Sequence, residues 1–536
     1  MSDERLGAQA FLEQLVACGV RWIFGNPGTT EQTVIDYLQD YEDIDLVLAL
    51  HEGVAVGAAD GYARATGDVG VVELHAGPGL GNGIGTIYNA FISHTPMIVY
   101  VGQSEQRALY QEPVLTADLV GMAEPVTKWA YEVRTADEIP QVVRRAFQVA
   151  TTPPCGPVLL SIPLDLTDAP CTAPVVPMRA TRSAVRPDPA AIDEARRVIA
   201  GASAPVLLVG DGVATSGAVA DVGRLAALLG APILEGAAFE TVVAPDDPHD
   251  AGRLPGDPAA AGRALEPYDV VVAIGTRVLA QVFPAAGPPL GAHPLVHIGP
   301  DPWELGKNQP GTLVLGDERA AVLDLTPLLE PNPARDAEVI EHLADTRAAR
   351  LAADARHPAH RVFAELGAAL PDDVCVVDES MSYYDLATRH LPRRVGSWFR
   401  GAGGIGMGLP RALGVQLAHP DRPVVAVVGD GAAMYSLTAL WTAAHHELPV
   451  VWVILNNGAY RTLKQNTLKG RTPQAADHVF VGADLTDPDV DFLAVAEGFG
   501  VRAIRVDDPA DIATAVHAAL SSGAPALIDL VVDGQL

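Results

Sequence analysis

Two short polar turns in the C-terminal part of the sequence have the residue types of a metal and phosphate site. The apolar run at 424–428 ends in "GDG" at 429–431, and a second apolar run ends in "NNGAY" at 456–460, with 24 residues between the GDG and the NN. Carboxylate, amide and carbonyl oxygens are the ligands that Mg²⁺ prefers, and phosphate oxygens complete its octahedral shell. The two turns therefore predict a Mg²⁺ site beside a diphosphate, with Asp430 and Asn457 as side-chain ligands.

The glycines beside Asp430 fit this prediction. Gly429 and Gly431 let the backbone approach a diphosphate closely, and the N–H groups at the start of a helix attract its charge. A second GDG at 210–212 is an internal control, because the same spacing leads from it to two alanines at 237–238, which cannot bind a metal. A GDG alone is more simply a tight turn, whereas a GDG followed by NN at this spacing is specific.

The turns need strands to position them, and the apolar runs predict such strands. Unbroken Val, Ile and Leu runs are typical of strands buried on both faces of a parallel sheet. Between them lie stretches with apolar residues at helical spacing, such as 437–444. The chain is therefore predicted to be an α/β protein in which the carboxyl ends of neighbouring strands bring Asp430 and Asn457 together. The predicted strands are 45–50, 97–102, 205–210, 269–275, 423–429 and 449–455.

The length and composition predict three domains. A chain of 536 residues is too long for one core. Two stretches rich in Pro and Ala, 168–189 and 328–339, predict linkers. The predicted domains, each a parallel sheet flanked by helices, are 1–170, 190–330 and 350–536.

The first and third predicted domains share an internal spacing. A strand opening at Val71 or Val424, a glycine-rich turn and a helix lead to a proline that starts the next strand, 25 residues later in each case. In this register Gly77 corresponds to Asp430. We expect the two domains to share one layout with different chemistry at the same turn; chance similarity between two βαβ units is the alternative.

The composition argues against several classes of protein. The chain has 36 Lys and Arg against 66 Asp and Glu, so nucleic acids and anionic membrane surfaces are not expected as partners. Hydrophobic residues make up 49%, as in a globular protein. The four cysteines form no CxxC pair, and neither a signal peptide nor a membrane-spanning run is visible. We therefore expect a cytoplasmic protein.

The sequence resembles the thiamine-diphosphate-dependent decarboxylase and carboligase family, with the benzoylformate decarboxylases as the nearest likeness. The resemblance covers nearly the whole chain. It implies pyrimidine-binding, central and diphosphate-binding domains in that order, with thiamine diphosphate and Mg²⁺ between the first domain of one subunit and the third of another. Because this arrangement needs two subunits, the resemblance also implies a homodimer or homotetramer. The motifs are "FGNPGTTE" (24–31), "LALHEGVAVGAADGYARATG" (48–67), "LHAGPGLGNGIG" (74–85), "SHTPMIV" (93–99), "VTKWAYE" (126–132), "GPVLLSIPLD" (156–165), "AGGIGMGLP" (402–410) and the GDG and NN turns.

The resemblance implies roles for single residues at the cofactor. Asp430, Asn457 and the backbone carbonyl of Ala459 match the metal ligands. Glu52 matches the glutamate that binds the aminopyrimidine ring and exchanges a proton with it, although the first turn of a helix also favours an acid. Ile405 matches the bulky residue that keeps the cofactor bent, and core packing is the alternative. Further predicted cofactor contacts are Gly429, Gly431, Ala432 and Tyr460.

Two residues of the first domain match catalytic residues that face the substrate. Thr29 is expected to hydrogen-bond the substrate carboxylate, with a helix N-cap as the alternative. His75 is expected to transfer protons. The second catalytic histidine of benzoylformate decarboxylases aligns with Val282 in this chain, while His293 and His297 are out of register. This departure leaves the protonation step without its usual residue.

The predicted pocket for the substrate tail also departs from the family pattern. Arg400 stands where the relatives have a small neutral residue, and Asn466 where they have a phenylalanine; Thr462 and Leu463 occupy neighbouring positions. An aromatic pocket has become polar, so we expect a 2-oxo acid with a polar or anionic tail. An ion pair between Arg400 and a protein carboxylate is the alternative.

The resulting prediction is a lyase that decarboxylates a small 2-oxo acid non-oxidatively. A carboligase or lyase like acetolactate synthase or benzaldehyde lyase is the alternative within the family. A nucleotide-binding oxidoreductase is disfavoured, because "GPGLGNG" at 77–83 has no acid at a second strand end about 20 residues further on. A catalytically inactive regulatory subunit is disfavoured by the intact Glu52.

Overall fold

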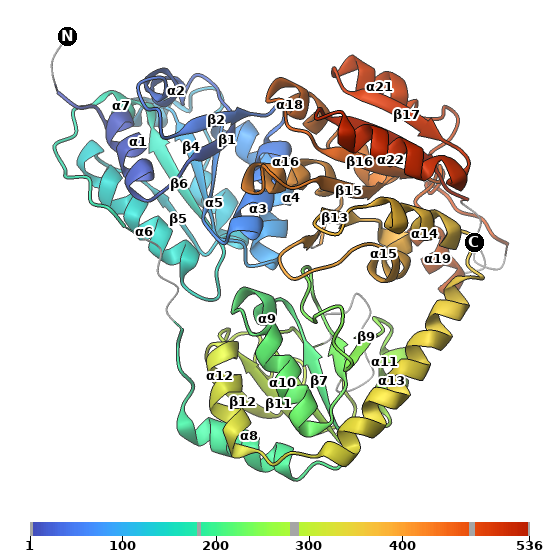
Figure 1. The fold of residues 1–536 in the computed structure, drawn as a ribbon. Coiled ribbons are helices and arrows are strands. Elements are labelled where there is room, and N and C mark those ends of the chain that lie inside the picture. The colour runs from blue at the N-terminus through green and yellow to red at the C-terminus, as the bar shows by residue number, and fades with distance from the viewer. Residues whose placement is uncertain (1–3, 179–183, 279–288, 402, 471–476, 534–536) are drawn as a thin grey trace. The chain divides into compact units, whose positions relative to one another are not determined.

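Three six-stranded parallel sheets, each flanked by helices, organise the chain (Figure 1). The structure is a computed structural model that describes residues 4–178, 184–278, 289–401, 403–470 and 477–533. The predicted α/β class is confirmed. Contacts divide the chain into two compact units: Met1–Thr181, Pro358–Pro392 and Phe399–Leu536 hold the first and third sheets, and Arg182–His357 with Arg393–Trp398 hold the central sheet.

The first sheet contains β1 (Trp22–Asn26), β2 (Asp45–Leu48), β3 (Gly70–Leu74), β4 (Met97–Gln103), β5 (Trp129–Glu132) and β6 (Pro157–Pro163) in the order β2-β1-β3-β4-β6-β5. Its helices are α1 (Gly7–Ala17), α2 (Gln32–Leu38), α3 (Glu52–Thr66), α4 (Ala76–Ile92), α5 (Leu119–Ala123), α6 (Ile139–Thr151) and α7 (Leu164–Asp168). Helices α3, α4 and α5 share one hydrophobic cluster with the sheet, and α1 and α6 share another. Strands β3, β4 and β6 are buried throughout, which explains their unbroken apolar sequences.

The third sheet contains β13 (Cys375–Glu379), β14 (Trp398–Arg400), β15 (Val424–Gly429), β16 (Val451–Asn456), β17 (Arg502–Val506) and β18 (Ala526–Val531) in the order β14-β13-β15-β16-β18-β17. Its helices are α14 (His360–Ala369), α15 (Tyr384–His390), α16 (Gly408–Ala418), α17 (Asp430–Ala433), α18 (Ala439–His445), α19 (Arg461–Lys469), α21 (Phe492–Gly498) and α22 (Ile512–Ser521). Numbered from its own first strand, this order equals that of the first sheet, so the predicted repeat is confirmed. The matching helices begin at Ala76 and Asp430, which places Ala76 rather than Gly77 at the position of Asp430.

The central sheet contains β7 (Pro205–Val209), β8 (Ile233–Glu235), β9 (Asp250–Arg253), β10 (Val270–Ile274), β11 (Leu295–Gly299) and β12 (Thr312–Leu315) in the order β12-β11-β10-β7-β8-β9. Its helices are α8 (Pro189–Ala200), α9 (Asp211–Thr215), α10 (Val219–Leu229), α11 (Pro258–Leu265), α12 (Glu318–Leu325) and α13 (Pro333–Asp354). Taken from the β9 edge, this is the 3-2-1-4-5-6 order that dinucleotide-binding sheets use. The turn after β7 therefore lies where sheets of this order bind a diphosphate.

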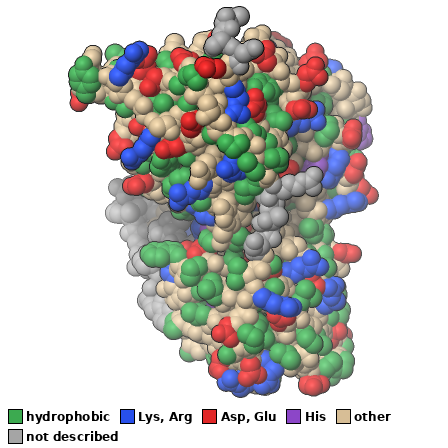
Figure 2. Space-filling view, turned by 90° about the vertical axis from the view of Figure 1, so that its left-hand side faces the viewer, with side chains coloured by type: hydrophobic (Ala, Val, Ile, Leu, Met, Phe, Trp, Pro, Cys, Tyr) green, Lys and Arg blue, Asp and Glu red, His purple; other side chains and the backbone are tan. Residues whose placement is uncertain are grey.

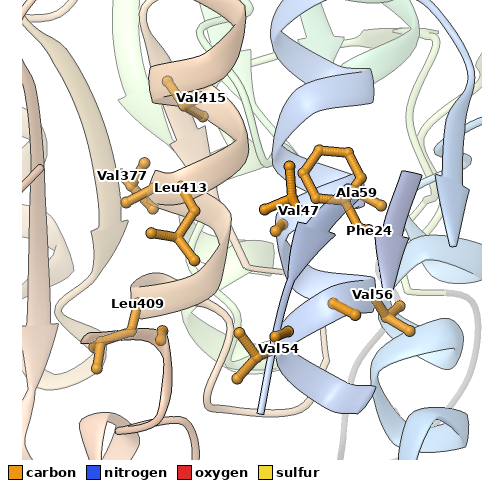
Figure 3. Close-up of a cluster of buried hydrophobic side chains, with 14 of the residues drawn as sticks. Phe24, Val47, Val54, Val56, Ala59, Val377, Leu409, Leu413 and Val415 are labelled. Carbon is orange, nitrogen blue, oxygen red and sulfur yellow. The ribbon is translucent and has the colours of Figure 1, made fainter. Parts of the chain in front are cut away.

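Helices α3 and α16 join the first and third sheets through very close packing. A Cβ added to Gly414 of α16 would overlap the carbonyl oxygen of Ala58 in α3, and one added to Gly61 would overlap that of Arg411. Figure 3 shows side chains of both helices, among them Val54 and Leu413, in one hydrophobic cluster. Since α3 begins with Glu52 and α16 follows the segment with Ile405, this packing fixes two predicted cofactor residues within one unit.

Two sequence-based expectations differ from the structure. The run at 45–50 forms β2, which lies at an edge of its sheet and ends at Leu48, so it is not buried on both faces. The predicted linker at 328–339 is wrong from Pro333 onward, because α13 begins there. Asn332 accepts a hydrogen bond from the N–H of Arg335, and proline suits the first helical position because the N–H that it lacks would have no partner there.

The surface carries both signs of charge. Figure 2 shows Asp and Glu interspersed with Lys and Arg on the face in view. Although the chain as a whole has more acidic than basic residues, this face carries both signs of charge. In the described part of the chain, no helix is long and apolar enough to cross a membrane.

Candidate active site

Asp430 lies where β15 ends and α17 begins, and it is 4% exposed. Its Oδ2 atom accepts hydrogen bonds from the N–H groups of Asn457 (3.1 Å) and Gly458 (2.6 Å), and Oδ1 accepts one from Gly431 (2.8 Å). Strand β16 pairs directly with β15, so the turn that follows β16 reaches the carboxylate. The GDG and NN turns thus meet at one edge of the sheet, as the sequence predicts.

The oxygen atoms around Asp430 fit a divalent cation. Burial raises the pKa of the Asp430 carboxyl, and the backbone N–H donors oppose that shift. A bound cation would compensate the buried charge. Within the described residues, no three His, Cys, Asp or Glu side chains are grouped to hold a metal, so a cation here would need amide, carbonyl and phosphate oxygens beside the Asp430 carboxylate. The Asn457 side chain is placed by two hydrogen bonds, from the N–H of Ala459 (3.0 Å) and to the Tyr383 hydroxyl (3.4 Å).

The two glycines beside Asp430 have different surroundings. A Cβ at Gly429 would meet only the carbonyl oxygen of Glu379, at 3.9 Å, so the space there is open for a phosphate. A Cβ at Gly431 would overlap the ring of Tyr460. Gly431 is therefore needed for the packing of Tyr460, a reason that the sequence does not reveal. Ala432 is buried in the hydrophobic cluster that α17 shares with the sheet.

A cavity of about 250 Å³ lies at the carboxyl ends of β15, β16 and β18. Asp430, Asn457 and Gly458 line one part of it, and Asp489 and Arg505 line another. Ligands of α/β sheets bind at this end of the strands. The cavity therefore places open space directly at the predicted metal ligands.

Glu52 is the first residue of α3 and is 8% exposed. Its Oε2 atom accepts a hydrogen bond from Nδ2 of Asn82 in α4 (3.0 Å). Gly79, also in α4, leaves room for the carboxylate, since a Cβ there would lie 3.1 Å from Oε1. An acid that only stabilises a helix end needs no such partner. The buried, hydrogen-bonded Glu52 fits the proton-exchanging role that the resemblance implies.

His75 stands between β3 and α4 and contacts two polar residues of the loop after β1. Its Nδ1 atom lies 2.8 Å from Oε2 of Glu31 and 3.1 Å from the hydroxyl oxygen of Thr30. The Thr30 hydroxyl donates to the other Glu31 oxygen at 2.6 Å. Because Nδ1 faces these groups, Nε2 is the ring nitrogen left to exchange a proton with a substrate.

Thr29 is exposed, whereas Thr30 and Glu31 make the contacts with His75. The alternative of an N-cap for Thr29 is wrong, because α2 begins at Gln32 and Glu31 holds the N-cap position. Sequence reasoning missed Thr30 and Glu31. No local signal distinguishes two adjacent threonines, since only the strand order brings His75 beside one of them.

Glu73 is a second acid that the sequence-based analysis missed. It lies on β3 between Gly25 of β1 and Tyr100 of β4, and it is fully buried. Neither carboxyl oxygen has a hydrogen-bond partner among the described residues. Burial, and then the charges of Glu31 and Glu52, raise its pKa well above the usual range. An acid inside the apolar run "VVEL" is unusual, and this feature of the sequence could have identified Glu73 as a buried acid.

Arg400 ends β14, and its side chain is 14% exposed. Its guanidinium lies over the ring of Tyr384, 3.3 Å from the ring centre, and Nε is 3.8 Å from Oδ2 of Asp378. This distance is too long for a hydrogen bond. The ion pair with a protein carboxylate that the alternative expected is therefore present, although within the described chain the guanidinium donates no hydrogen bond to Asp378.

The other predicted substrate residues lie on α19. Thr462 and Leu463 are adjacent, and Asn466 lies about one turn further along the helix. Leu463 is 53% exposed, and Asn466 is exposed as well. The Thr462 hydroxyl is 2.8 Å from that of Ser382. One helix therefore presents these side chains together.

The histidines near the position of the missing catalytic residue are structural. Val282 itself lies outside the described residues. His297 is buried on β11, where Nε2 is 3.0 Å from the carbonyl oxygen of Thr276 and burial lowers its pKa. His293 contacts the carbonyl oxygen of Leu290 through Nδ1 (2.5 Å). Both stay out of register with Val282 and are bonded locally.

The GDG turn of the central sheet is filled by protein. A Cβ at Gly212 would overlap the carboxylate of Glu318, and Asp211 accepts hydrogen bonds from the N–H groups of Phe239 (2.7 Å) and Glu240 (3.1 Å). Burial raises the pKa of Glu318 to about 8. Side chains therefore occupy the place where a dinucleotide-binding sheet holds a diphosphate. This GDG forms the start of α9 rather than the tight turn expected from the sequence. The oxidoreductase alternative gains no support.

Models of thiamine pyrophosphate enzymes match three parts of the chain: the N-terminal TPP binding domain at residues 5–122, the central domain at 192–325 and the C-terminal TPP binding domain at 380–530. Benzoylformate decarboxylase of Pseudomonas aeruginosa is 34% identical over 526 residues, 96% of each chain. Acetolactate synthase of Arthrospira platensis is 29% identical over 558 residues, 98% of this chain and 93% of its own. A solved structure of thiamine diphosphate-dependent 4-hydroxybenzoylformate decarboxylase from Rhodococcus jostii RHA1 shares 31% identity and covers 99% of both chains, with a TM-score of 0.87.

Proposed function

We propose that this chain, which belongs to the thiamine pyrophosphate enzymes, decarboxylates a 2-oxo acid non-oxidatively and requires Mg²⁺ as well as thiamine diphosphate (thiamine pyrophosphate). The observation that carries the proposal is the buried carboxylate of Asp430, held against the NN turn beside an open cavity. A benzoylformate decarboxylase and a 4-hydroxybenzoylformate decarboxylase are among the relatives that match nearly the whole chain.

Residues from both sheets of the unit contribute to this activity. Asp430, Asn457 and the carbonyl of Ala459 would hold Mg²⁺, and the N–H groups at the start of α17 would face the phosphates. Glu52 would hold and release a proton at the aminopyrimidine ring. When bound, thiamine diphosphate supplies the centre that stabilises the negative charge left by the departing CO₂. The family arrangement would bring Glu52 to the Asp430 site of a second copy, so we propose a homodimer or homotetramer.

His75 and Thr29 would act on the substrate side. His75 can give a proton from Nε2 to the carbon that loses CO₂, because Glu31 and Thr30 hold its other ring nitrogen. Thr29 is exposed and free to meet the substrate carboxylate from the same loop. Because Val282 stands where the relatives have their second catalytic histidine, we propose that His75 carries the protonation step.

The tail of the substrate is proposed to be polar or anionic. Arg400 stacks on Tyr384 and stands 3.8 Å from Asp378, so its hydrogen-bond donors remain available for a carboxylate or hydroxyl group of a ligand. Asn466 and Thr462 would add polar contacts from α19. Benzoylformate has an apolar ring as its tail and would leave these groups without partners.

Carboligation is the second candidate. The match to an acetolactate synthase over 98% of this chain favours it, since the same sheets and cofactor can serve either reaction. The two functions differ in what happens after CO₂ leaves: a decarboxylase adds a proton, whereas a carboligase adds a second carbonyl compound. His75, placed to supply that proton, favours decarboxylation.

The test is a substrate panel with purified protein, thiamine diphosphate and Mg²⁺. Benzoylformate, its 4-hydroxy derivative, 2-oxo acids with carboxylate tails and pyruvate are compared by CO₂ release and by product analysis. We expect CO₂ and an aldehyde from a polar-tailed 2-oxo acid, with the reaction lost in EDTA and restored by Mg²⁺. Acetolactate formed from pyruvate as the main product would establish the carboligase instead.

A further inference from the structure

Ile405 lies in a segment that belongs to neither a helix nor a strand. Residues 403–407 form no regular secondary structure, and α16 begins only at Gly408. Gly406 has a φ of 98°, a conformation that residues with side chains rarely adopt. The N–H groups of such a segment, and those of the first turn of a helix, receive no partner from regular structure. Ile405 itself is only partly buried against the hydrophobic cluster. Other contacts must therefore hold its backbone.

Glu379 supplies three of these contacts on the C-terminal side of Ile405. It is the last residue of β13 and is 3% exposed. Its Oε1 atom accepts hydrogen bonds from the N–H groups of Gly406 (2.8 Å) and Met407 (3.1 Å), and Oε2 accepts one from Gly408 (2.7 Å). Burial raises its pKa, while these three N–H groups and the charge of Arg411 act in the opposite direction.

Asn89 supplies two contacts on the N-terminal side. It lies on α4 and is 2% exposed. Its Oδ1 atom accepts a hydrogen bond from the N–H of Gly404 (2.8 Å), and its Nδ2 donates to the carbonyl oxygen of Gly404 (3.1 Å). A Cβ at Gly403 would lie 2.9 Å from the same Oδ1 atom, so a glycine is needed for this approach. The same helix begins directly after His75.

We propose that Glu379 and Asn89 are positioning residues for Ile405, which they hold from both sides through five backbone hydrogen bonds. This inference rests on the proposed function, in which Ile405 presses against the bound cofactor. A side chain that keeps a ligand bent must stay in place under the force of the ligand, and a loop without these hydrogen bonds would be displaced. All five hydrogen bonds join residues of one chain and involve no cofactor atom, so the segment can be held before the cofactor binds.

Hydrogen exchange of the cofactor-free wild-type protein is the first test. The amides of Gly404, Gly406, Met407 and Gly408 are expected to exchange at least about 10-fold more slowly than in an unstructured peptide, since each donates to a buried acceptor. Gly403, one residue outside the held stretch, is the internal reference. Exchange of all four amides at the unstructured rate would overturn the proposal without any variant.

Two variants then show which side chain protects which backbone amides from hydrogen exchange. Glu379→Gln keeps the size of the side chain but turns a donor toward an N–H group, so exchange at 406–408 should rise about 10- to 100-fold. Asn89→Ala should do the same at Gly404. Glu73→Gln is the matched control, because it also removes a buried carboxyl from a strand of this unit without touching the segment. Equal protection in Glu379→Gln and wild type would contradict the role of Glu379.

A double-mutant cycle shows whether Glu379 acts through Ile405. Ile405→Ala and Glu379→Gln should each lower kcat at least about 10-fold with little change in KM, and the double variant should be no slower than the slower single variant. Independent, multiplying losses would mean that Glu379 acts elsewhere. A wild type without thiamine-dependent turnover would refute the proposed function, whereas the exchange rates would still decide whether the two residues hold the segment.

Discussion

Nδ1 of His75 lies 2.8 Å from a carboxylate oxygen of Glu31, whose side chain is completely shielded from solvent. The Glu31 carboxylate also accepts a hydrogen bond from the N–H of Gly28 (3.1 Å) and one from the Thr30 hydroxyl (2.6 Å). Glu31 thus accepts hydrogen bonds from two donors, and the His75 ring nitrogen lies at hydrogen-bond distance from the same carboxylate. Glu73, nearby on β3, has no donor among the described residues, and burial raises its pKa.

Replacing these two acids should therefore have unequal effects. Glu31→Gln removes the negative charge that orients His75, so we expect kcat to fall by about 10²-fold, in line with general acid–base contributions. Glu73→Gln keeps the size of a side chain that has no hydrogen-bond partner among the described residues, so it should change kcat by less than about threefold. Both variants are measured by steady-state kinetics, and a larger loss in Glu73→Gln than in Glu31→Gln would contradict the positioning role of Glu31.

The metal site should depend on Asp430. Asp430→Ala removes the carboxylate that would neutralise Mg²⁺ and leaves the N–H groups of Asn457 and Gly458 without their acceptor. We expect thiamine diphosphate binding, measured by calorimetry in the presence of Mg²⁺, to weaken by at least about 100-fold, because a removed metal partner costs a large part of the binding free energy. Asp489→Ala, at the other side of the cavity, is the control. Unchanged affinity in Asp430→Ala would contradict the site.

Glu52 should separate cofactor binding from catalysis. Glu52→Gln keeps the shape of the side chain and its hydrogen bond with Asn82, but an amide cannot exchange a proton. We expect cofactor affinity within a few-fold of wild type and a drop in kcat of at least about 100-fold. Asn82→Ala should give a smaller loss, since it disturbs only the orientation. Full activity of Glu52→Gln would remove the assigned role.

Arg400 should determine the choice of substrate. Arg400→Leu removes the donors that lie over Tyr384. For an anionic-tailed 2-oxo acid, we expect kcat/KM to fall by a factor that corresponds to about 2–4 kcal/mol of lost transition-state stabilisation. For apolar 2-oxo acids, kcat/KM should change little. The variant is measured against both classes of substrate. Equal losses for the two classes would show that Arg400 serves Asp378 and the fold rather than the ligand.

The ion pair between Asp60 and Arg411 should matter for stability. Both side chains are fully buried, and the Arg411 guanidinium donates to one Asp60 oxygen from Nε (2.8 Å) and Nη2 (2.6 Å), joining α3 to α16. Arg411→Met leaves an unpaired buried carboxylate, so we expect a loss of about 3–5 kcal/mol in urea unfolding. The double variant Asp60→Leu/Arg411→Met should recover part of that loss. A cost below about 1 kcal/mol in Arg411→Met would contradict this account.

The sequence alone was sufficient for the features that depend on short-range patterns. Unbroken apolar runs identify buried parallel strands, and the GDG and NN turns follow two such runs. Because successive parallel strands end at the same edge, their turns meet without any knowledge of the rest of the fold. The contact between Asp430 and the turn at Asn457 and Gly458 was therefore predictable.

Only the tertiary structure decided which residues surround the site from a distance. Thr30 rather than Thr29 contacts His75, because the order β1-β3 brings two loops together that lie 45 residues apart. Glu379 and Asn89 reach the segment around Ile405 from elements 27 and 315 residues away. Such contacts are made by side chains that look ordinary in their local sequence, since their function arises from burial and from the partner that the fold places opposite them.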